Sequence, residues 1–460
     1  MIRTMTIPRR TRIVAALFVL VLVGPGIYAF DWGGSLTTTN TVQSVQEGSD
    51  DDTFVNSERL ALYLVGDIGA TRDYVTQLGV RFSSDGPTFA ADLERFYLRN
   101  TLSPESTSVV ALTTQLGRFY ATDPTGEVFR HVVDGASLTI EGTWWNLAMR
   151  AGTTALINKE FSNVAMSIRD NDDADDDDTY LGPARFVGML RFGLPSIVAG
   201  QSFNVALVAQ EDMRDPASVV QEGDLPDQVT EPGGVIDTQY ILFTADGPIL
   251  GSLFYTFGYG LGLGRTLSLV EDADATGGEA YRYQPIRAHL VKLGLEYYLS
   301  DFYSSVVRAG VTVSTGDDDY ASYTEGNTSG NATMFIPVSA SGDGAVFGLQ
   351  TGNATIAELS YSLKPLETAA SPFLSEFQTV ATWYSFFRTA GKGPVSVSDV
   401  DPTADAAYLG SEFDLAFRFR PYSDLGFGLT NGFFFGNGDA LFDDADSFGW
   451  IVRLQASLSF

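Results

Sequence analysis

The sequence of 460 residues contains no cysteine and only two histidines, His131 and His289. Without cysteine the chain has no disulfide, no thiolate ligand for structural zinc and no N-terminal cysteine for a lipid anchor. Neither histidine lies in a motif that would pair it with a nucleophile, so catalysis by an imidazole has no support. The composition predicts neither an enzyme nor a metalloprotein, and it implies no cofactor.

Basic residues are also scarce, with 28 Lys and Arg against 57 Asp and Glu and a formal net charge of -29. Such a chain repels polyanions, which excludes a nucleic-acid partner. Acidic disordered proteins are poor in aromatic residues, whereas this chain has 12% aromatic residues and 47 glycines. That combination is typical of strands and tight turns.

Long apolar runs are missing, except for one near the N-terminus. A basic segment precedes an apolar run at residues 13–23, which ends at a Gly-Pro-Gly breaker and the small residue Ala29. The run is shorter than the about 20 residues that a membrane-spanning helix needs. This order predicts an exported chain with a cleaved signal peptide at residues 1–29. Residues 30–460 are then expected to form a single domain.

The remaining sequence is rich in apolar and polar residues that alternate with a period of two. At the C-terminus, Trp450, Leu458 and Phe460 share one face with other apolar residues, while Arg453 and Ser457 lie on the opposite, largely polar face. This ending resembles the C-terminal strand of bacterial outer-membrane β-barrel proteins, where a terminal Phe is part of the insertion signal. We therefore expect the three apolar residues to be recognised by the barrel-assembly machinery.

About eighteen strand candidates follow one another, and the connections between them alternate in length. Short connections are expected at 66–73, 101–107, 143–145, 195–200, 246–248, 300–302, 365–372 and 421–424. Longer ones are expected at 44–53, 84–89, 121–135, 153–182, 211–234, 268–282, 316–353, 389–408 and 436–447.

This sorting into two lengths is what an outer-membrane barrel needs, because its periplasmic turns are short and its external loops are long. A soluble β-sandwich protein is the alternative, but that architecture does not require such sorting. We predict an all-β transmembrane antiparallel β-barrel of about 18 strands, with 16 as the alternative count. Its location would be the outer membrane of a double-membraned bacterium, in contact with outer-membrane lipid.

Charged residues recur on the polar phase of the strands, and facing lipid at mid-depth would cost about 2–4 kcal/mol for each basic residue. They are therefore expected to face the lumen, and some could form the charged ring that sets selectivity at the narrowest point. The alternative for each is a lumen salt bridge that stiffens the barrel. The candidates for lining the pore are Arg95, Arg99, Arg118, Glu141, Arg185, Arg191, Arg308, Glu358, Asp414 and Arg418.

Several loops carry further expectations. A loop folded inward, at 153–182 or 316–353, should narrow the lumen. The alternating glycines at 258–264 should leave room for another chain segment close to the wall. The acidic run at 170–178 lacks the glycine and the closing glutamate of an EF-hand, which favours a solvated loop over a metal site. His131 is expected in the loop at 121–135 and His289 on a lipid-facing row.

Three segments carry a family resemblance: Leu116-Gly117-Arg118-Phe119, the strand from Tyr408 to Leu415, and the segment from Phe417 to Leu425. They are similar to porins of the alginate-export type, in which a Gly-Arg strand end and a Gly-x-Glu-x-Asp-Leu strand recur. The resemblance implies an eighteen-stranded porin frame. In this chain, basic residues share the inward phase with acids, which differs from the basic lumen that a polyanion exporter needs.

We therefore expect a porin-like channel, monomeric or homotrimeric, for passive diffusion of small hydrophilic solutes. The alternative is a plugged surface barrel that acts as an adhesin or a structural outer-membrane protein through its long acidic loops. Ion conductance separates the two hypotheses. An active transporter with an N-terminal plug is disfavoured, since strand-like alternation starts by 33–42.

Overall fold

The computed structural model describes residues 29–44, 52–176, 178–214, 220–226, 235–272, 275, 277–320, 323–324, 327–443 and 445–460. The predicted signal peptide lies outside the described residues except for Ala29, which begins the first strand. Within the described part of the chain, no helix is long and apolar enough to cross a membrane. The predicted boundary between signal peptide and barrel stays a prediction.

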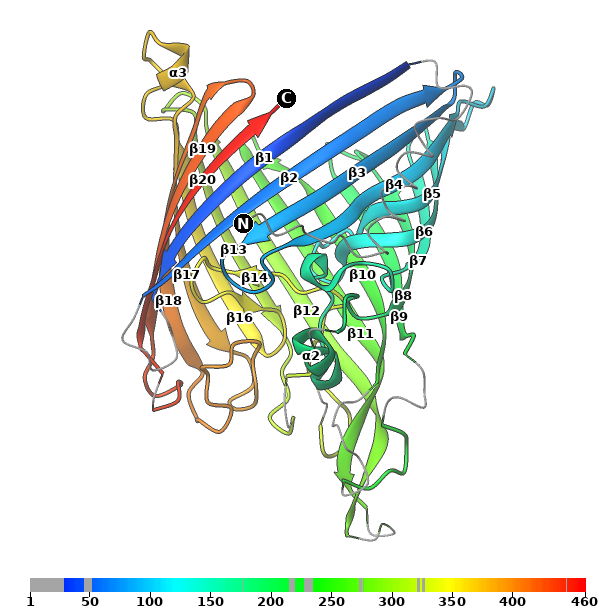
Figure 1. Cartoon of the computed structure of the whole chain (residues 1–460), viewed down its shortest axis with the longest axis vertical. Helices are drawn as coiled ribbons and strands as arrows, with labels where there is room; N and C mark the ends of the chain where they lie inside the picture. The colour runs from blue at the N-terminus through cyan, green and yellow to red at the C-terminus, as the bar shows by residue number, and fades with distance from the viewer. Residues whose placement is uncertain are drawn as a thin grey trace, which may run out of the picture.

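Eighteen antiparallel strands form one closed barrel (Figure 1). The strands are β1 (Ala29–Gln43), β2 (Thr53–Ile68), β3 (Arg72–Ser83), β4 (Ala90–Leu102), β5 (Val109–Thr122), β6 (Arg130–Gly142), β7 (Asn146–Thr153), β8 (Arg185–Leu194), β9 (Ser202–Asp212), β10 (Ile236–Leu250), β11 (Leu253–Glu271), β12 (Glu279–Leu299), β13 (Ser305–Ser314), β16 (Ala354–Leu363), β17 (Gln378–Arg388), β18 (Tyr408–Tyr422), β19 (Leu425–Gly436) and β20 (Phe448–Ser459). The described loops add the short pair β14 (Gly342–Asp343) and β15 (Leu349–Gln350), the 3-10 helix η1 (Lys159–Phe161), and helices α2 (Ile168–Asp175) and α3 (Pro372–Ser375).

The barrel closes between its first and last strands. The β1–β20 ladder runs from the pair Ser35↔Ser459 to the pair Gln43↔Ile451. Beyond it, the Phe460 N–H donates to the Gly34 carbonyl at 3.0 Å, and the Gly34 N–H donates to the Phe460 carbonyl at 2.9 Å. The predicted count of eighteen is confirmed, and the C-terminal residues complete the last seam of the wall.

The expected short and long connections lie at opposite ends of the barrel (Figure 1). One departs from the expected lengths: the connection 364–377, with α3, at the short-turn end is longer than the loops 84–89, 123–129 and 272–278 at the other end. Three predicted connections were misplaced. The β5–β6 loop spans only 123–129 and the β11–β12 loop only 272–278, because the flanking strands continue further. The turn expected at 246–248 lies at 251–252. Pro248 is tolerated inside β10 because the ladder is already irregular there, close to the strand end.

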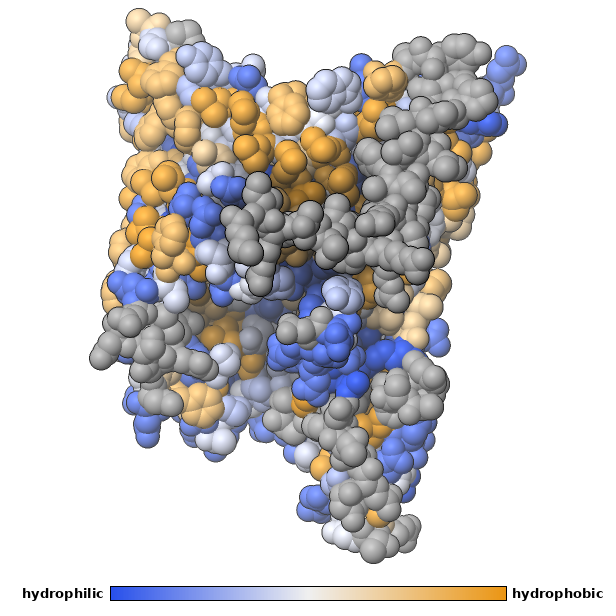
Figure 2. Space-filling view, viewed as in Figure 1, coloured by the Kyte–Doolittle hydropathy of each residue, from blue (hydrophilic) through white to orange (hydrophobic). Residues whose placement is uncertain are grey.

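The outer surface of the wall is apolar, as a lipid-facing surface requires. Figure 2 shows hydrophobic residues over much of the wall and a hydrophilic concentration toward the long loops. The exposed apolar side chains come from all around the barrel and include Leu36, Leu116, Leu190, Leu207, Leu293, Leu359 and Leu454.

The inward face is less polar than the sequence predicted. Over β8 to β12, inward side chains such as Met189, Leu242 and Leu290 are buried in an apolar cluster with loop residues Met334 and Phe335. A second apolar cluster joins β16 to β19 with the loops 389–407 and 437–447. An inserted loop needs an apolar surface to pack against, and alternation alone does not distinguish that surface from lipid-facing residues.

The glycines of β11 serve the role that the sequence suggested. A Cβ added to Gly260 or Gly262 would lie 3.6 Å from the Phe335 ring, and one added to Gly258 would lie 3.7 Å from Thr125. The bare backbone on the inward face of β11 thus admits the loop 315–353 close to the wall. A side chain larger than that of alanine at Gly260 or Gly262 would displace the Phe335 ring.

Replacing Phe335 with alanine tests this packing. Removing a fully buried ring should destabilise the docked loop by about 3–5 kcal/mol, while the barrel ladders stay intact. Limited proteolysis of the folded protein should then cut within 315–353 faster than in the wild type. Leu293→Ala, on the lipid-facing side of β12, is the matched control and should leave the cutting rate unchanged. Equal protection of Phe335→Ala and wild type would contradict the packing described.

Candidate functional site

Two long loops fold into the lumen and meet there. The loop 154–184, with η1 and α2, and the loop 315–353, with β14 and β15, both lie within the barrel outline in Figure 1. Val164 and Ser339 form an antiparallel bridge between them, and the Ser339 N–H also donates to the Val128 carbonyl of the β5–β6 loop at 3.2 Å. One inward loop was expected, with these two as alternatives; both fold inward, and backbone hydrogen bonds join them.

Arg118 attaches the loop 154–184 to the wall. Its guanidinium donates to Asp92 of β4 at 2.8 Å, to Asp134 of β6 at 2.8 Å and to the Leu156 carbonyl of the loop at 2.9 Å. The side chain is nearly buried, and these charge-assisted bonds compensate its desolvation. A second contact joins Arg81 of β3 to Glu160.

Arg185 and Arg214 form a buried ion cluster with two aspartates at the other end of the same loop. Arg185 pairs with Asp170 and lies 3.4 Å from Asp212, while Arg214 lies 3.5 Å from Asp170 and 2.5 Å from Asp212. Asp170 also completes a capping box at the start of α2 with Ser167. The acidic run expected to be a solvated loop is thus largely helical from 168 to 175 and is docked by its first turn.

Glu412 of β18 holds the loop 315–353 from the opposite wall. This carboxylate is fully buried and accepts the backbone N–H groups of Ala345, Val346 and Phe347, the last two at 2.9 Å. Asp414 accepts the Ala345 N–H as well, at 3.2 Å. Successive N–H groups that converge on one carboxylate stabilise its negative charge without a basic side chain.

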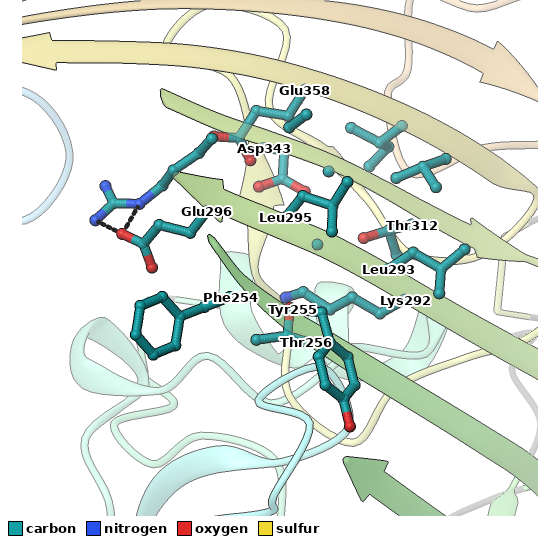
Figure 3. A pocket seen from close by; sticks show the side chains of 16 residues that line it. Phe254, Tyr255, Thr256, Lys292, Leu293, Leu295, Glu296, Thr312, Asp343 and Glu358 are labelled. Atoms are coloured by element: carbon teal, nitrogen blue, oxygen red, sulfur yellow. Dashed lines mark hydrogen bonds and ion pairs between the residues drawn. The ribbon is translucent and has the colours of Figure 1, made fainter. Parts of the chain in front are cut away.

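A cavity of about 200 Å³ lies between the wall and the loop 315–353 (Figure 3). Gly294 and Gly310 are direct partners in the β12–β13 ladder and leave this patch of the wall without side chains. Asp343 of the loop reaches the same cavity. The other polar side chains around it are Thr256, Lys292, Glu296, Arg308, Thr312 and Glu358.

The charges at this cavity do not balance. Lys292 pairs with Glu127 of the β5–β6 loop, and Arg308 lies 2.6 Å from Glu296. Within the described residues, Asp343 and Glu358 have no salt-bridge or hydrogen-bond partner for their side chains. Burial and the nearby negative Glu127 raise the pKa of Asp343 to about 6, against the lowering effect of Lys292. With all four carboxylates ionised, the cavity has a surplus of negative charge.

A larger cavity of about 1000 Å³ opens at the short-turn end, lined mainly by β17 to β20. Arg418 and Arg453 line it together with Gln378 and Gln455. Neither arginine has a salt-bridge partner in the part of the chain that the structure describes. The two cavities therefore differ: the smaller one, beside the inserted loop, is rich in acidic residues, and the larger one at the short-turn end has guanidinium groups without a salt-bridge partner among the described residues.

The other predicted lining residues lie apart from these cavities. Arg99 pairs with Asp73 at 2.9 Å, and Arg191 donates to Asn204 at 2.8 Å. Arg95 is exposed opposite Gln77 in the β3–β4 register, and Glu141 is exposed beside the turn 143–145. The structure thus brings together Arg308 and Glu358 at one cavity and places Arg418 at the other. Arg118, Arg185 and Asp414 contact the inserted loops.

Sequence reasoning missed the acidic residues that matter most for the inserted loops. Glu412 lies two residues from Asp414 and shares its inward phase, so the sequence did place a second carboxylate on the inner side of this strand. Asp343 lies in a loop without a periodic pattern, so the sequence did not indicate that its side chain reaches the lumen. His131, expected in a loop, is buried in β6 beside Ser162, while His289 lies on the lipid-facing row with Tyr259 at 2.9 Å. No cluster of three potential metal ligands occurs among the described residues.

Comparisons with known proteins support the barrel architecture. No protein-family model and no curated protein matches this chain. Among solved structures, OccK9 (OpdG) of Pseudomonas aeruginosa matches with a TM-score of 0.57 and 12% identity over 95% of this chain and 100% of that chain. OccK11 (OpdR) of the same organism matches with a TM-score of 0.51 and 13% identity over 94% and 96%. OpdO, also from Pseudomonas aeruginosa, matches with a TM-score of 0.51 and 14% identity over 94% of this chain and 98% of that chain.

At these identities the likeness shows the fold: this chain shares an eighteen-stranded barrel with the Occ structures. The alginate-export resemblance gains no support from the comparisons. The short Gly-Arg and Gly-x-Glu-x-Asp-Leu segments are explained by their local roles. Gly117 adopts a φ of 121° where a Cβ would lie 2.2 Å from the Phe96 carbonyl, and Glu412 anchors an inserted loop.

Replacing Glu412 with alanine should release the tip of the loop 315–353. The Val346 and Phe347 N–H groups would lose their acceptor, at a cost of about 1–3 kcal/mol for each buried donor left unpaired, while the Ala345 N–H would keep only Asp414. We expect faster amide hydrogen exchange at Ala345, Val346 and Phe347 in the folded barrel. Glu141→Ala, at an exposed site, is the control. Unchanged exchange in Glu412→Ala would show that the apolar clusters alone fix the loop.

Proposed function

We propose that this protein is an outer-membrane channel through which small hydrophilic solutes diffuse passively. The observation that carries the proposal is the lumen itself: inserted loops leave a charged cavity beside the wall, and a wide polar vestibule follows at the short-turn end. The similar Occ structures are outer-membrane porins, which supports the same function here. The alternation of short turns and long loops favours an orientation with the vestibule in the periplasm.

The proposed path uses only part of the predicted residues. Glu358 and Arg308 would contact solutes beside the loop 315–353, and Arg418 would meet them in the vestibule. Arg95, Arg99, Glu141 and Arg191 remain candidate lining residues of the wall. Arg118, Arg185 and Asp414 act on solutes only indirectly, because their contacts hold the loops that set the width.

Cations should be favoured at the narrow part of this path. The carboxylates of Asp343 and Glu358 lack partners among the described side chains, while Lys292 and Arg308 are each paired. Fixed negative charge in a narrow, poorly screened region raises the local concentration of cations. A polyanion such as alginate fits this region poorly, so the alginate-export function is not part of the proposal.

The remaining expectations fit the same proposal. Outer-membrane lipid would surround the apolar wall, and the barrel-assembly machinery would recognise the last strand through Trp450, Leu458 and Phe460. Leu458 and Phe460 are exposed on the outer side, and Phe460 completes the closing seam. The barrel closes within one chain, which is compatible with either a monomer or a homotrimer.

A plugged barrel with an adhesive or structural role is the second candidate. The observation that favours it is the pair of apolar clusters that fix the loops inside the lumen. An inserted loop that is held so firmly could block the path rather than narrow it. Such a barrel would fold and insert normally but would carry no current.

Single-channel recording of the refolded protein in a planar bilayer separates the two candidates. We expect stable openings and a reversal potential that shows cation preference. Glu358→Gln should reduce that preference, because it removes one of two unpaired charges at the narrow part, whereas Glu105→Gln, in the exposed turn 103–108, should not. A heat-modifiable barrel without conductance would reject the channel and leave the plugged form.

The cation preference should also depend on pH through Asp343. Because its pKa of about 6 lies above the ordinary 3.8, Asp343 loses its charge as the pH falls through 6, while most exposed carboxylates stay ionised. Reversal potentials measured from pH 7.5 to pH 5 should therefore shift toward weaker cation preference. Asp343→Asn should already show the weaker preference at pH 7.5 and should lose the step near pH 6. A step that persists in this variant would assign the titration to another group.

A further inference from the structure

The lipid-facing side of the β11–β12 hairpin changes character toward the long loops. Near the middle of the wall it is apolar, with Leu293 and Leu295 exposed to the outside. Further along β12, His289 accepts or donates a hydrogen bond with Tyr259 at 2.9 Å. Two residues beyond His289 comes Arg287, also exposed. The intervening residues point inward, since Ala288 and Leu290 are buried against the inserted loop.

The position of Arg287 along the strand corresponds to the level of lipid headgroups. Tyr297 and His289 are eight residues apart on β12, which is about 26 Å along the strand and about 20 Å across the membrane at a typical tilt. That length approaches the apolar band of about 25 Å that such barrels carry. Arg287 therefore lies at the outer rim of this band, on the side of the long loops, where the outer leaflet has its headgroups.

A second arginine lies on the same face. The β11–β12 register pairs Leu263 with Arg287 and Arg265 with Pro285, so the two arginines are diagonal neighbours, about 7–8 Å apart. The Arg265 guanidinium carbon lies 4.2 Å from the centre of the Tyr283 ring. Its Nε donates to Asp237 at 3.0 Å. Two contacts thus fix the plane of Arg265 before any ligand binds.

Both arginines keep free donors. Within the described residues, the Arg287 guanidinium has no hydrogen bond or salt bridge, and Arg265 has no partner for its two terminal nitrogens. Asp237 pairs with Arg265, and Glu222 also acts on Arg265 electrostatically, whereas Arg287 has no charged partner among the described residues. In a chain with 28 basic and 57 acidic residues, an arginine without a carboxylate partner on the long-loop rim leaves its donors available to water or to an anion outside the protein.

We propose that Arg265 and Arg287 bind a phosphate group of a lipid in the outer leaflet. Planar guanidinium groups match phosphate oxygens with two parallel hydrogen bonds, and two diagonal arginines can grip one phosphomonoester from both sides. The apolar surface below, with His289 and Leu293, would contact the acyl chains of the same lipid. Inorganic phosphate, the alternative ligand, has no acyl chains and could contact only the two arginines. This site does not depend on whether the lumen conducts.

Native mass spectrometry of the whole barrel in a neutral detergent tests the site, with hexa-acyl lipid A as the phosphate-bearing probe. The double variant Arg265→Gln/Arg287→Gln should bind lipid A about tenfold more weakly than the wild type, because it loses charge-assisted bonds. Arg72→Gln, an exposed arginine at the short-turn rim, is the matched control and should bind like the wild type. Heat-modifiability establishes that each variant is folded.

Two further arms define the ligand. Lipid A stripped of its phosphates should bind the wild type and the double variant equally weakly. Millimolar inorganic phosphate should leave lipid A bound to the wild type. Equal lipid A affinity of the wild type and the double variant would overturn the proposal. Displacement of lipid A by inorganic phosphate would overturn the assignment to a lipid and indicate a general anion site.

Discussion

The structure depends on one constraint: inside a bilayer every backbone N–H and C=O must find a partner within the protein. A sheet meets this demand only by closing on itself, and here the closing seam is the β1–β20 ladder. The pairing at this seam includes Phe460, which is hydrogen bonded through both of its backbone groups to Gly34. Closure then creates an interior that lipid cannot fill, and the rest of the molecule is organised around that interior.

Two long loops occupy part of this interior, and the buried polar groups of these loops need hydrogen-bond partners. The wall supplies the partners: Arg118 and Arg185 on one side for the loop 154–184, and Glu412 on the other for the loop 315–353. Apolar patches then exclude water between wall and loop. These anchors hold the loops in the lumen, and in the proposed function they decide whether the barrel conducts or is plugged.

Much of this architecture was predictable from the sequence, because lipid imposes a period of two and the two aqueous sides impose two loop lengths. The strand count, the inserted loops and the room left by Gly260 and Gly262 all followed from that pattern. The apolar inward face of β8 to β12 did not, since alternation cannot tell a lipid-facing row from a row that packs on a loop. Asp343 was missed because it reaches its cavity through an aperiodic loop, whose path depends on contacts far apart in sequence.

The scarcity of basic residues gives each of them diagnostic value. In a strongly acidic protein a guanidinium finds a carboxylate easily, and Arg99, Arg118, Arg185 and Arg308 all do so. Among the arginines without a partner in the described residues, Arg418 and Arg453 line the cavity at the short-turn end, and Arg287 lies exposed on the outer side of the wall. A guanidinium without a carboxylate partner avoids a large desolvation penalty only where it contacts water or an anion. The positions of these side chains therefore carry both proposals, the solute path for Arg418 and Arg453 and the lipid site for Arg287.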